Sequence, residues 1–172
     1  YTFHLRPGVK FASGNPLTAQ DVRFSLRRLK HLKDNPSFFM DPVKEIDFIE
    51  LHDAYTSSEI QTYEDLALCK YGEGGRFVEE GHPFMPQIDY GLKLKTKGTI
   101  PVNPSGGLIA CGHPVGATGL MQAVFAFWQI QGTIKKHYGS QELQLKKANR
   151  GLIHSHAGTG TYVTVSILER GW

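Results

Sequence analysis

His113 is the residue whose neighbours in the sequence most clearly suggest chemistry. It lies in a glycine-rich stretch, residues 102–120, whose glycines allow positive φ and a close approach of the backbone to other groups. Pro114 follows it and fixes φ at a value from which a helix can begin. A histidine at the start of a helix lies beside unpaired N–H groups, whose positive field favours the neutral imidazole. Because a neutral imidazole can accept a proton, the stretch predicts a general base at His113.

A second histidine, His52, follows a predicted strand. Apolar residues at positions 46, 48 and 51 give residues 44–51 the spacing of a strand. Thr56 and Glu59 then form a capping-box pattern, which predicts that a helix begins there. The expected inner face of that helix consists of Ile60, Tyr63, Leu66 and Ala67. A polar residue between the end of a strand and a helix is where α/β proteins place site chemistry, so His52 is a candidate site residue.

Two more histidines, His154 and His156, lie near the C-terminus. The segment from Gly151 predicts a strand that ends in a glycine turn, and residues 161–168 alternate as a last strand. The inward side of that last strand would carry Val163, Val165 and Ile167. If the segments that carry these histidines share one sheet, their imidazoles should converge to within about 10 Å of those of His52 and His113.

The segment 120–130 is apolar around nearly its whole circumference, which predicts a helix that is buried on all sides. One small domain can cover only about two-thirds of such a helix, so we expect an exposed patch that drives association. Residues 70–99, which include His82 as a surface histidine, predict a long loop with little regular structure. Residues 135–150 predict a polar surface loop.

Three motifs together resemble the thiolase superfamily. Residues 102–120 contain Asn-Pro-Ser-Gly-Gly, Gly-His-Pro and Gly-Ala-Thr-Gly, in the order of that family's Gly-His-Pro block. The sequence His-Asp-Ala-Tyr from His52 is similar to the His-Asp-Ala-Phe block of the branch that contains archaeal acetyl-CoA acetyltransferases and sterol-carrier-protein-type thiolases. The segment from Gly151 resembles the C-terminal block, where many members have Cys-x-Gly and this chain has His154 and His156. The resemblance covers residues 43–172.

The resemblance implies an α/β fold: a thiolase-like half with a mixed sheet and helices on both faces, incomplete without a partner half. It also implies Claisen chemistry on acyl-CoA thioesters, with coenzyme A as co-substrate and without a tightly bound cofactor or metal. His113 would activate a nucleophilic cysteine on the N-terminal half, and His52, with an ordered water, would donate to the enolate oxygen. His154 could take the α-proton role of the missing cysteine. Backbone N–H groups near His156 and Gly158 would hold the acyl carbonyl.

The nucleophile of the family has no counterpart in this chain. Neither Cys69 nor Cys111 has the context of that cysteine, and side chains as close in sequence as those of Cys111 and His113 usually point apart. We therefore expect no turnover by the isolated chain, and the sequence leaves open whether it is an enzyme. It is either the C-terminal half of an acyltransferase, which binds an N-terminal half or a second copy, or a recombined or excised domain that self-associates without catalysis. Part of a thiolase-like retro-aldolase is a further alternative.

Residues 1–42 predict a separate segment. Residues 1–7 alternate as a strand, and a basic amphipathic helix with Val22, Leu26 and Leu29 on one face is expected after Thr18. The run resembles extracytoplasmic peptide-binding proteins of ABC transporters. The chain is therefore predicted to be a chimera of the segment 1–42 and a thiolase-like domain 43–172.

Composition excludes several classes of partner. The formal net charge of the 172 residues is only +3, which argues against a chain-wide nucleic-acid surface. No apolar run is long enough to span a bilayer, and the sequence has no signal-peptide pattern at its start. The two cysteines form no Cys-x-x-Cys pattern, which predicts a reduced, cytoplasmic setting. The start at Tyr1 predicts a fragment of a larger soluble protein.

Overall fold

The computed structural model describes residues 8–10, 14–18, 20, 46–158 and 161–171. The chain divides into two units, Tyr1–Lys44 and Glu45–Trp172. In the first unit, Lys10 and Pro16 form an isolated antiparallel bridge. The strand predicted at 1–7 and the helix predicted after Thr18 lie outside the described residues.

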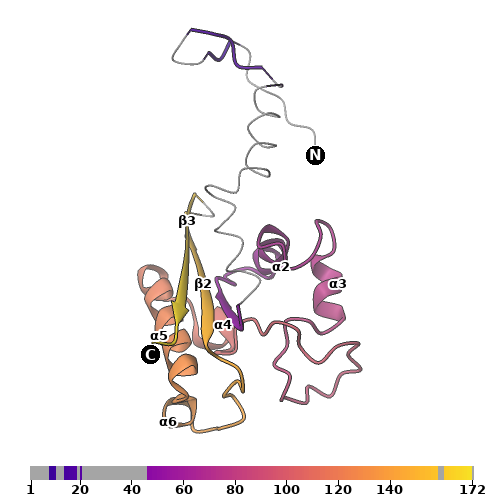
Figure 1. Ribbon diagram of the computed structural model, residues 1–172, viewed down its shortest axis with the longest axis vertical. Helices are drawn as coiled ribbons and strands as arrows, with labels where there is room; N and C mark the ends of the chain where they lie inside the picture. Colours follow the sequence, from indigo (N-terminus) through magenta and orange to yellow (C-terminus); the bar gives the residue numbers. More distant parts are fainter. Residues whose placement is uncertain (1–7, 11–13, 19, 21–45, 159–160, 172) are drawn as a thin grey trace. The chain divides into compact units, whose positions relative to one another are not determined.

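Three strands form a mixed sheet in the second unit, in the order β1 (Phe48–Leu51), β2 (Arg150–Ala157), β3 (Tyr162–Glu169) (Figure 1). β1 and β2 are parallel, and β2 and β3 form an antiparallel hairpin. Ile49 also makes a parallel bridge with Val102. β1, which precedes His52, and β2, which carries His154 and His156, therefore belong to one sheet as predicted, whereas the segment that leads to His113 joins it only through the bridge at Val102.

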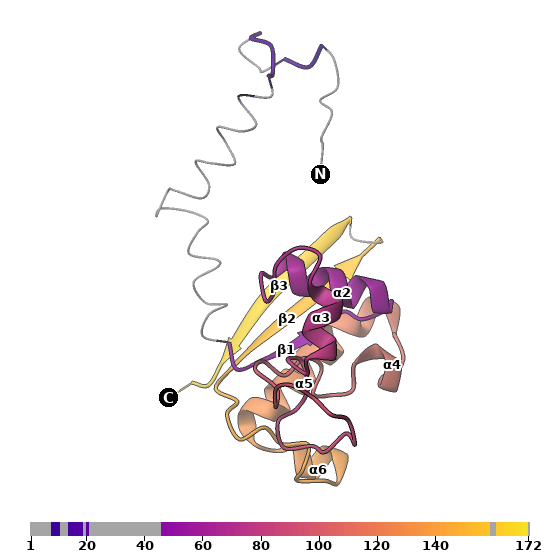
Figure 2. The same cartoon turned by 90° about the vertical axis from the view of Figure 1, so that its right-hand side faces the viewer.

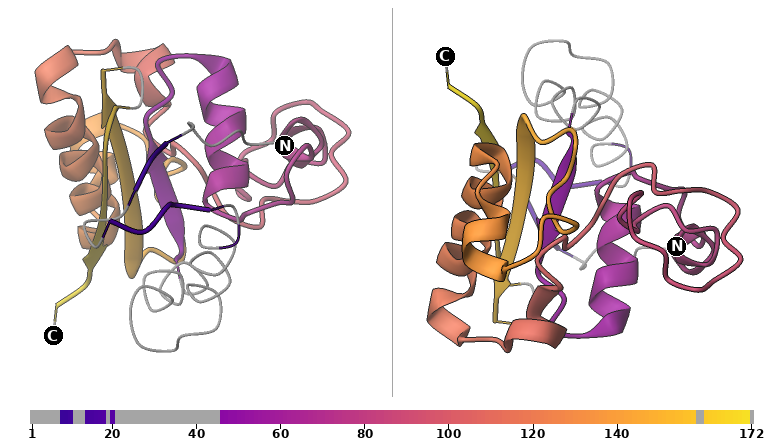
Figure 3. Two further views of the ribbon diagram at one scale, coloured as in Figure 1. Left: turned by 90° about the horizontal axis from the view of Figure 1, so that it is seen from above. Right: turned by 90° about the horizontal axis from the view of Figure 1, so that it is seen from below.

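Helices cover both faces of this sheet. α5 (Thr118–Gln131) packs on one face, while α2 (Thr56–Asp65) and α3 (Gly74–Glu79) lie on the other side (Figures 2 and 3). The predicted α/β class, with a mixed sheet between helices, is confirmed. The core between the sheet and α5 consists of Phe48, Met85, Ala126, Ile130, Leu145, Ala148 and Ile153.

The burial of the strands differs from the simple alternation that the sequence predicted. All four residues of β1 are buried, so both of its faces are covered. Nearly all of β3 is exposed, and Val163, Val165 and Ile167 are exposed rather than inward. In the ladder these three side chains stand opposite His156, His154 and Leu152. The reason is visible in Figure 3: α2 runs beside β1 and does not reach over β3.

α5 is not buried on all sides. Leu120, Val124 and Phe127, which we call the α5 apolar face, are exposed, with Leu120 at 73% and Phe127 at 50%. The predicted exposed patch is therefore confirmed. The buried side of α5 includes three polar residues, Thr118, Gln122 and Gln129. The Gln129 side chain donates to Leu143 O (2.8 Å) and accepts from Leu145 N (3.1 Å), so its burial leaves no unpaired amide.

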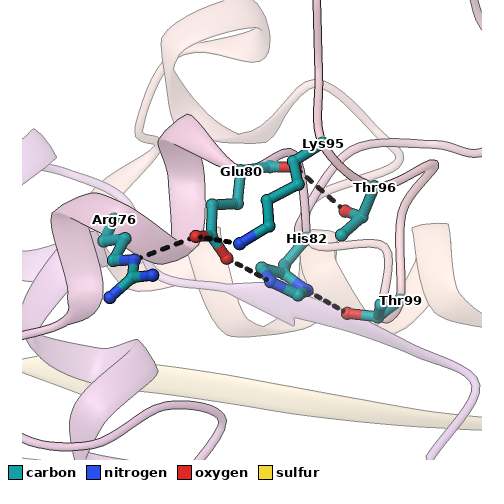
Figure 4. A network of polar contacts seen from close by, with 6 residues as sticks. All are labelled: Arg76, Glu80, His82, Lys95, Thr96 and Thr99. Atoms are coloured by element: carbon teal, nitrogen blue, oxygen red, sulfur yellow. Dashed lines mark hydrogen bonds and ion pairs between the residues drawn. The ribbon is translucent and has the colours of Figure 1, made fainter.

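Residues 70–99 contain more structure than a loop. α3 lies within them, and a polar network around the Glu80 carboxylate ties the rest of the segment to it (Figure 4). Lys95 Nζ and Arg76 Nε each lie 2.9 Å from Glu80 Oε1, and these contacts hold the pKa of Glu80 at about 2. His82 contacts Glu80 and Thr99 and is partly exposed, so it is a surface histidine that side-chain contacts hold in place.

Three local predictions about helices are also corrected. α2 begins at Thr56 without a side-chain cap, because Tyr55 and not Thr56 is the N-cap, and the Glu59 carboxylate accepts a hydrogen bond from the Tyr63 hydroxyl. Its buried residues are Thr62 and Tyr63, whereas Ala67 is exposed. The expected surface loop after α5 contains the short helix α6 (Ile134–Tyr138), and it buries Ile134, Leu145 and Ala148. Within the described residues, no helix has the length and apolar character needed to cross a bilayer.

Candidate active site

The glycine-rich stretch is fixed to the end of β1. Asn103 N donates to Ile49 O (2.7 Å), and Leu51 N donates to Asn103 Oδ1 (2.6 Å). A short helix that the sequence did not predict, α4 (Gly107–Cys111), then precedes Gly112 and His113. The stretch therefore returns His113 to the strand end that carries His52.

The candidate histidines converge. The ring centroids of His52 and His113 are 4.9 Å apart, and those of His52 and His156 are 4.0 Å apart. The rings of His154 and His156 are 5.9 Å apart. The predicted convergence within about 10 Å is confirmed. His52 lies at the centre of this group, which we call the histidine cluster.

Burial and mutual repulsion keep the inner members of the histidine cluster neutral. His52 is only 2% exposed, and burial, followed by the neighbouring imidazoles of His156 and His113, lowers its pKa to about 4. Burial and then His156 lower the pKa of His154 to about 4 as well. The pKa of His156 is lowered by burial and by His113. At neutral pH these groups are therefore uncharged and can donate through one ring nitrogen and accept through the other.

His113 differs from the others because it is exposed and held by a side chain. Its Nδ1 lies 2.8 Å from the Oγ1 of Thr118, the buried first residue of α5. The helix does not begin at Pro114 as predicted: a 3-10 turn, η3 (Val115–Ala117), comes first. His113 therefore lies outside the first turn of α5, and Thr118 is a site residue that the sequence reasoning missed. A hydroxyl five residues after the Gly-His-Pro histidine was the available signal.

Two imidazoles of the histidine cluster each have a ring nitrogen without a protein partner. Among the described residues, His52 Nδ1 and His154 Nδ1 are buried without a hydrogen-bond partner. Gln122 on α5, also missed from the sequence, donates to His154 O (3.1 Å) and fixes the backbone of β2 there. Gly158 lies in the turn after β2 and is exposed, with φ +58°.

The cysteines lie apart from this arrangement. Cys111 donates through Sγ to Gly107 O, and its partial burial, with the charges of Asp53 and Glu50, raises the pKa of its thiol. The pKa of Cys69 is also raised by burial. Both are free thiols. In the described part of the chain, no group of three or more His, Cys, Asp or Glu side chains is placed to hold a metal ion.

Residues 42–170 match the family model of the thiolase C-terminal domain-like proteins. The chain belongs to this family. The thiolase C-terminal domain-like region is 42% identical over 126 residues to an acetyl-CoA acetyltransferase of Methanothermobacter thermautotrophicus. The aligned region covers 73% of this chain and 28% of the relative. It is 41% identical over 128 residues to sterol carrier protein 2 of Bos taurus, which covers 74% of the chain and 20% of the relative. The chain thus corresponds to less than a third of either relative.

The N-terminal segment is similar to a different family. Residues 1–60 match the family of bacterial extracellular solute-binding proteins, family 5 middle, and this match overlaps the thiolase match between residues 42 and 60. Both predicted resemblances, including the branch of the thiolase family, are confirmed.

Proposed function

We propose that this chain supplies the C-terminal half of a thiolase-like acyltransferase that acts on acyl-CoA thioesters. The observation that carries the proposal is the contact of His52 with both His113 and His156 in a domain of this family. The matched relatives include proteins named acetyl-CoA acetyltransferase, which supports thioester chemistry. Coenzyme A would be a co-substrate rather than a bound cofactor.

His113 would act as the base. If its Nδ1–H donates to Thr118 Oγ1, the tautomer is fixed and Nε2 keeps its lone pair. Because His113 is exposed, that lone pair can receive the thiol proton of a cysteine supplied by the N-terminal half. The resulting thiolate is the nucleophile that attacks the thioester carbonyl.

The other members of the histidine cluster would handle the enolate. Neutral His52 can donate a ring N–H toward the enolate oxygen, directly or through a water, because its pKa of about 4 keeps it uncharged at pH 7. His154 would exchange the α-proton in place of the cysteine found in many family members. Backbone N–H groups near His156 and Gly158 would hold the acyl carbonyl.

The partner would be the N-terminal half, which would bring the nucleophile, or a second copy of this chain, which would bring only the same two cysteines. Neither cysteine of the chain lies in the histidine cluster, and both have raised pKa values, so the nucleophile must come from outside. The α5 apolar face offers the partner a surface. A reduced, cytoplasmic setting remains part of the proposal.

Complementation tests the proposal. The isolated chain should show no thioester loss with acetoacetyl-CoA and coenzyme A. Adding the portion of the Methanothermobacter acetyltransferase that lies outside the matched region should produce turnover, and His113→Ala should abolish it. Turnover by the chain alone that is lost in Cys111→Ser would overturn the missing-nucleophile argument. A β-hydroxyacyl-CoA in the same assay distinguishes acyl transfer from retro-aldol cleavage.

A second candidate, a non-catalytic domain that self-associates, is favoured by one observation, the exposed α5 apolar face. Sedimentation at micromolar concentration should then show oligomers, and Leu120→Ser with Phe127→Ser should shift them to monomers. Leu92→Ser is the matched control, because Leu92 is exposed outside this face. A monomeric wild-type chain would exclude this candidate.

A further inference from the structure

Two buried carboxyl groups bind the backbone of the glycine-rich stretch. Glu50, the third residue of β1, is 1% exposed, and Asp53, directly after His52, is 3% exposed. Ser105 donates to Glu50 through both its N–H (3.2 Å) and its hydroxyl (2.6 Å). Leu108 N donates to Asp53 Oδ1 at 2.8 Å. Neither carboxyl group was predicted from the sequence to have a role.

Asp53 is the carboxyl group that joins the two histidine-bearing segments. Its own segment carries His52, and its acceptor oxygen is bonded to α4, which ends at Cys111, two residues before His113. The contact is tight: a Cβ on Gly107 would lie 2.1 Å from Asp53 Oδ2, and Gly107 has φ +67°. No side chain therefore fits between the carboxylate and this part of the backbone.

We propose that Asp53 is a positioning residue, whose buried carboxylate holds α4 against the end of β1 and thereby holds His113 beside His52. The proposal takes the role of His113 from the proposed function, but the geometry that it predicts can be measured without turnover. Thr118 fixes the imidazole of His113 from the α5 side. Asp53 fixes the α4 backbone that precedes His113. Removing Asp53 therefore removes one of the two contacts that hold His113 in place.

The chain contains a matched control beside the same strand. Asp47, just before β1, has a side chain that is 2% exposed and accepts backbone hydrogen bonds from Asn149 (2.8 Å) and Arg150 (3.1 Å). It is thus also a buried aspartate that binds backbone N–H groups, but it lies at the opposite end of β1. A carboxylate with only a structural role should behave like Asp47.

The test uses the whole 172-residue chain with labelled histidines. In the wild type, ring protons of His52 and His113 should give a nuclear Overhauser effect, because their centroids are 4.9 Å apart. Asp53→Ala should abolish this signal, whereas Asp47→Ala should retain it even if its unfolding midpoint falls as far. Retention of the full signal in Asp53→Ala would overturn the proposal. Equal loss in Asp47→Ala would overturn it as well, since the effect would then follow from stability alone.

A milder variant keeps the proposal testable if Asp53→Ala does not fold. Asp53→Asn retains an acceptor oxygen but loses the charge, and charged acceptors form the stronger bonds. The Leu108 amide should then exchange with solvent at least about fivefold faster, and the signal between His52 and His113 should weaken. Unchanged Leu108 exchange would contradict the proposal. The complementation assay separates the two ideas: His113→Ala tests the base, and Asp53→Asn tests only its placement.

Discussion

β1 and β3 are strands of one sheet with similar apolar content, yet they have opposite surroundings. Every residue of β1 is buried, whereas Val163 and Val165 of β3 are more than half exposed. The difference arises from cover: β1 packs against α5 and pairs with β2 and Val102, with α2 running beside it, whereas among the described residues of the second unit no helix lies over the face of β3 opposite α5 (Figure 3). The histidine cluster is built on the enclosed side, since His52 follows β1 and His154 and His156 lie on β2. The site therefore lies on the buried strands of the sheet, whereas β3 is its exposed strand.

The largest expected loss of stability comes from truncating a buried side chain of β1. Ile49 is fully buried, so Ile49→Ala should lower the free energy of unfolding by about 2–5 kcal/mol. Denaturant unfolding followed by circular dichroism measures this change. A loss below about 1 kcal/mol would mean that β1 is not part of a packed core.

Acid should destabilise the enclosed side through the histidine cluster. The pKa of His52 is about 4 in the folded chain and 6.5 for a solvated histidine, so between these values the unfolded chain binds more protons. The stabilisation is therefore complete above pH 6.5 and is lost as the pH falls toward 4. This difference in the pKa of His52 corresponds to a stabilisation of about 3 kcal/mol. Unfolding curves from about pH 7 to pH 4 measure it.

The variant His52→Asn isolates this contribution. It removes the titrating group, so its free energy of unfolding should fall less steeply with acid than that of the wild type. Exposed His137→Gln serves as the control and should leave the slope unchanged. Parallel acid slopes for the wild type and His52→Asn would show that His52 is not buried in the neutral form.

Alkali should produce a smaller loss through Glu50. Burial raises its pKa to about 8 from 4.5, so the folded chain retains a proton that the unfolded chain has already released. Stability is therefore lost as the pH rises through 8, by about 1.4 kcal/mol between pH 7 and pH 9. Glu50→Gln resembles the protonated form and should flatten this decline, whereas exposed Glu142→Gln should not. Thermal unfolding of the three proteins at both pH values provides the measurement.

The smallest expected effect lies on the open strand. Val165 is 51% exposed, so Val165→Thr should change the free energy of unfolding of the monomer by less than about 0.5 kcal/mol. Denaturant unfolding at low protein concentration measures this. A loss as large as that of Ile49→Ala would show that another part of the chain or a second copy covers β3 in solution.

The sequence predicted those features that depend on local pattern. Strand positions, the family and the convergence of His52 with His113 all follow from motifs at the ends of predicted elements. The placement of Val163 and Val165 failed because alternation shows that a strand has two different faces but does not show which face will be covered. The capping box at Thr56 failed for a local reason: Tyr55 is the N-cap, so Thr56 already lies inside the helix, and Glu59 accepts from Tyr63 one turn further along α2.

The parts of the site that escaped prediction are polar residues in apolar surroundings. Thr118 and Gln122 lie in a helix whose composition suggested only packing, and their partners are His113 and the backbone of β2. Asp53 escaped because its partner is a backbone N–H 55 residues away in sequence. Contacts of this kind appear only when the chain is folded.

The glutamines of α5 have a consequence for how the helix docks. A helix that is apolar around its circumference gains nearly the same hydrophobic free energy at many rotations about its axis. Gln129, which bonds Leu143 O and Leu145 N, and Gln122, which donates to His154 O, can reach these partners at only one rotation. The two amides therefore select the rotational register, and with it they decide that Leu120 and Phe127 face outward.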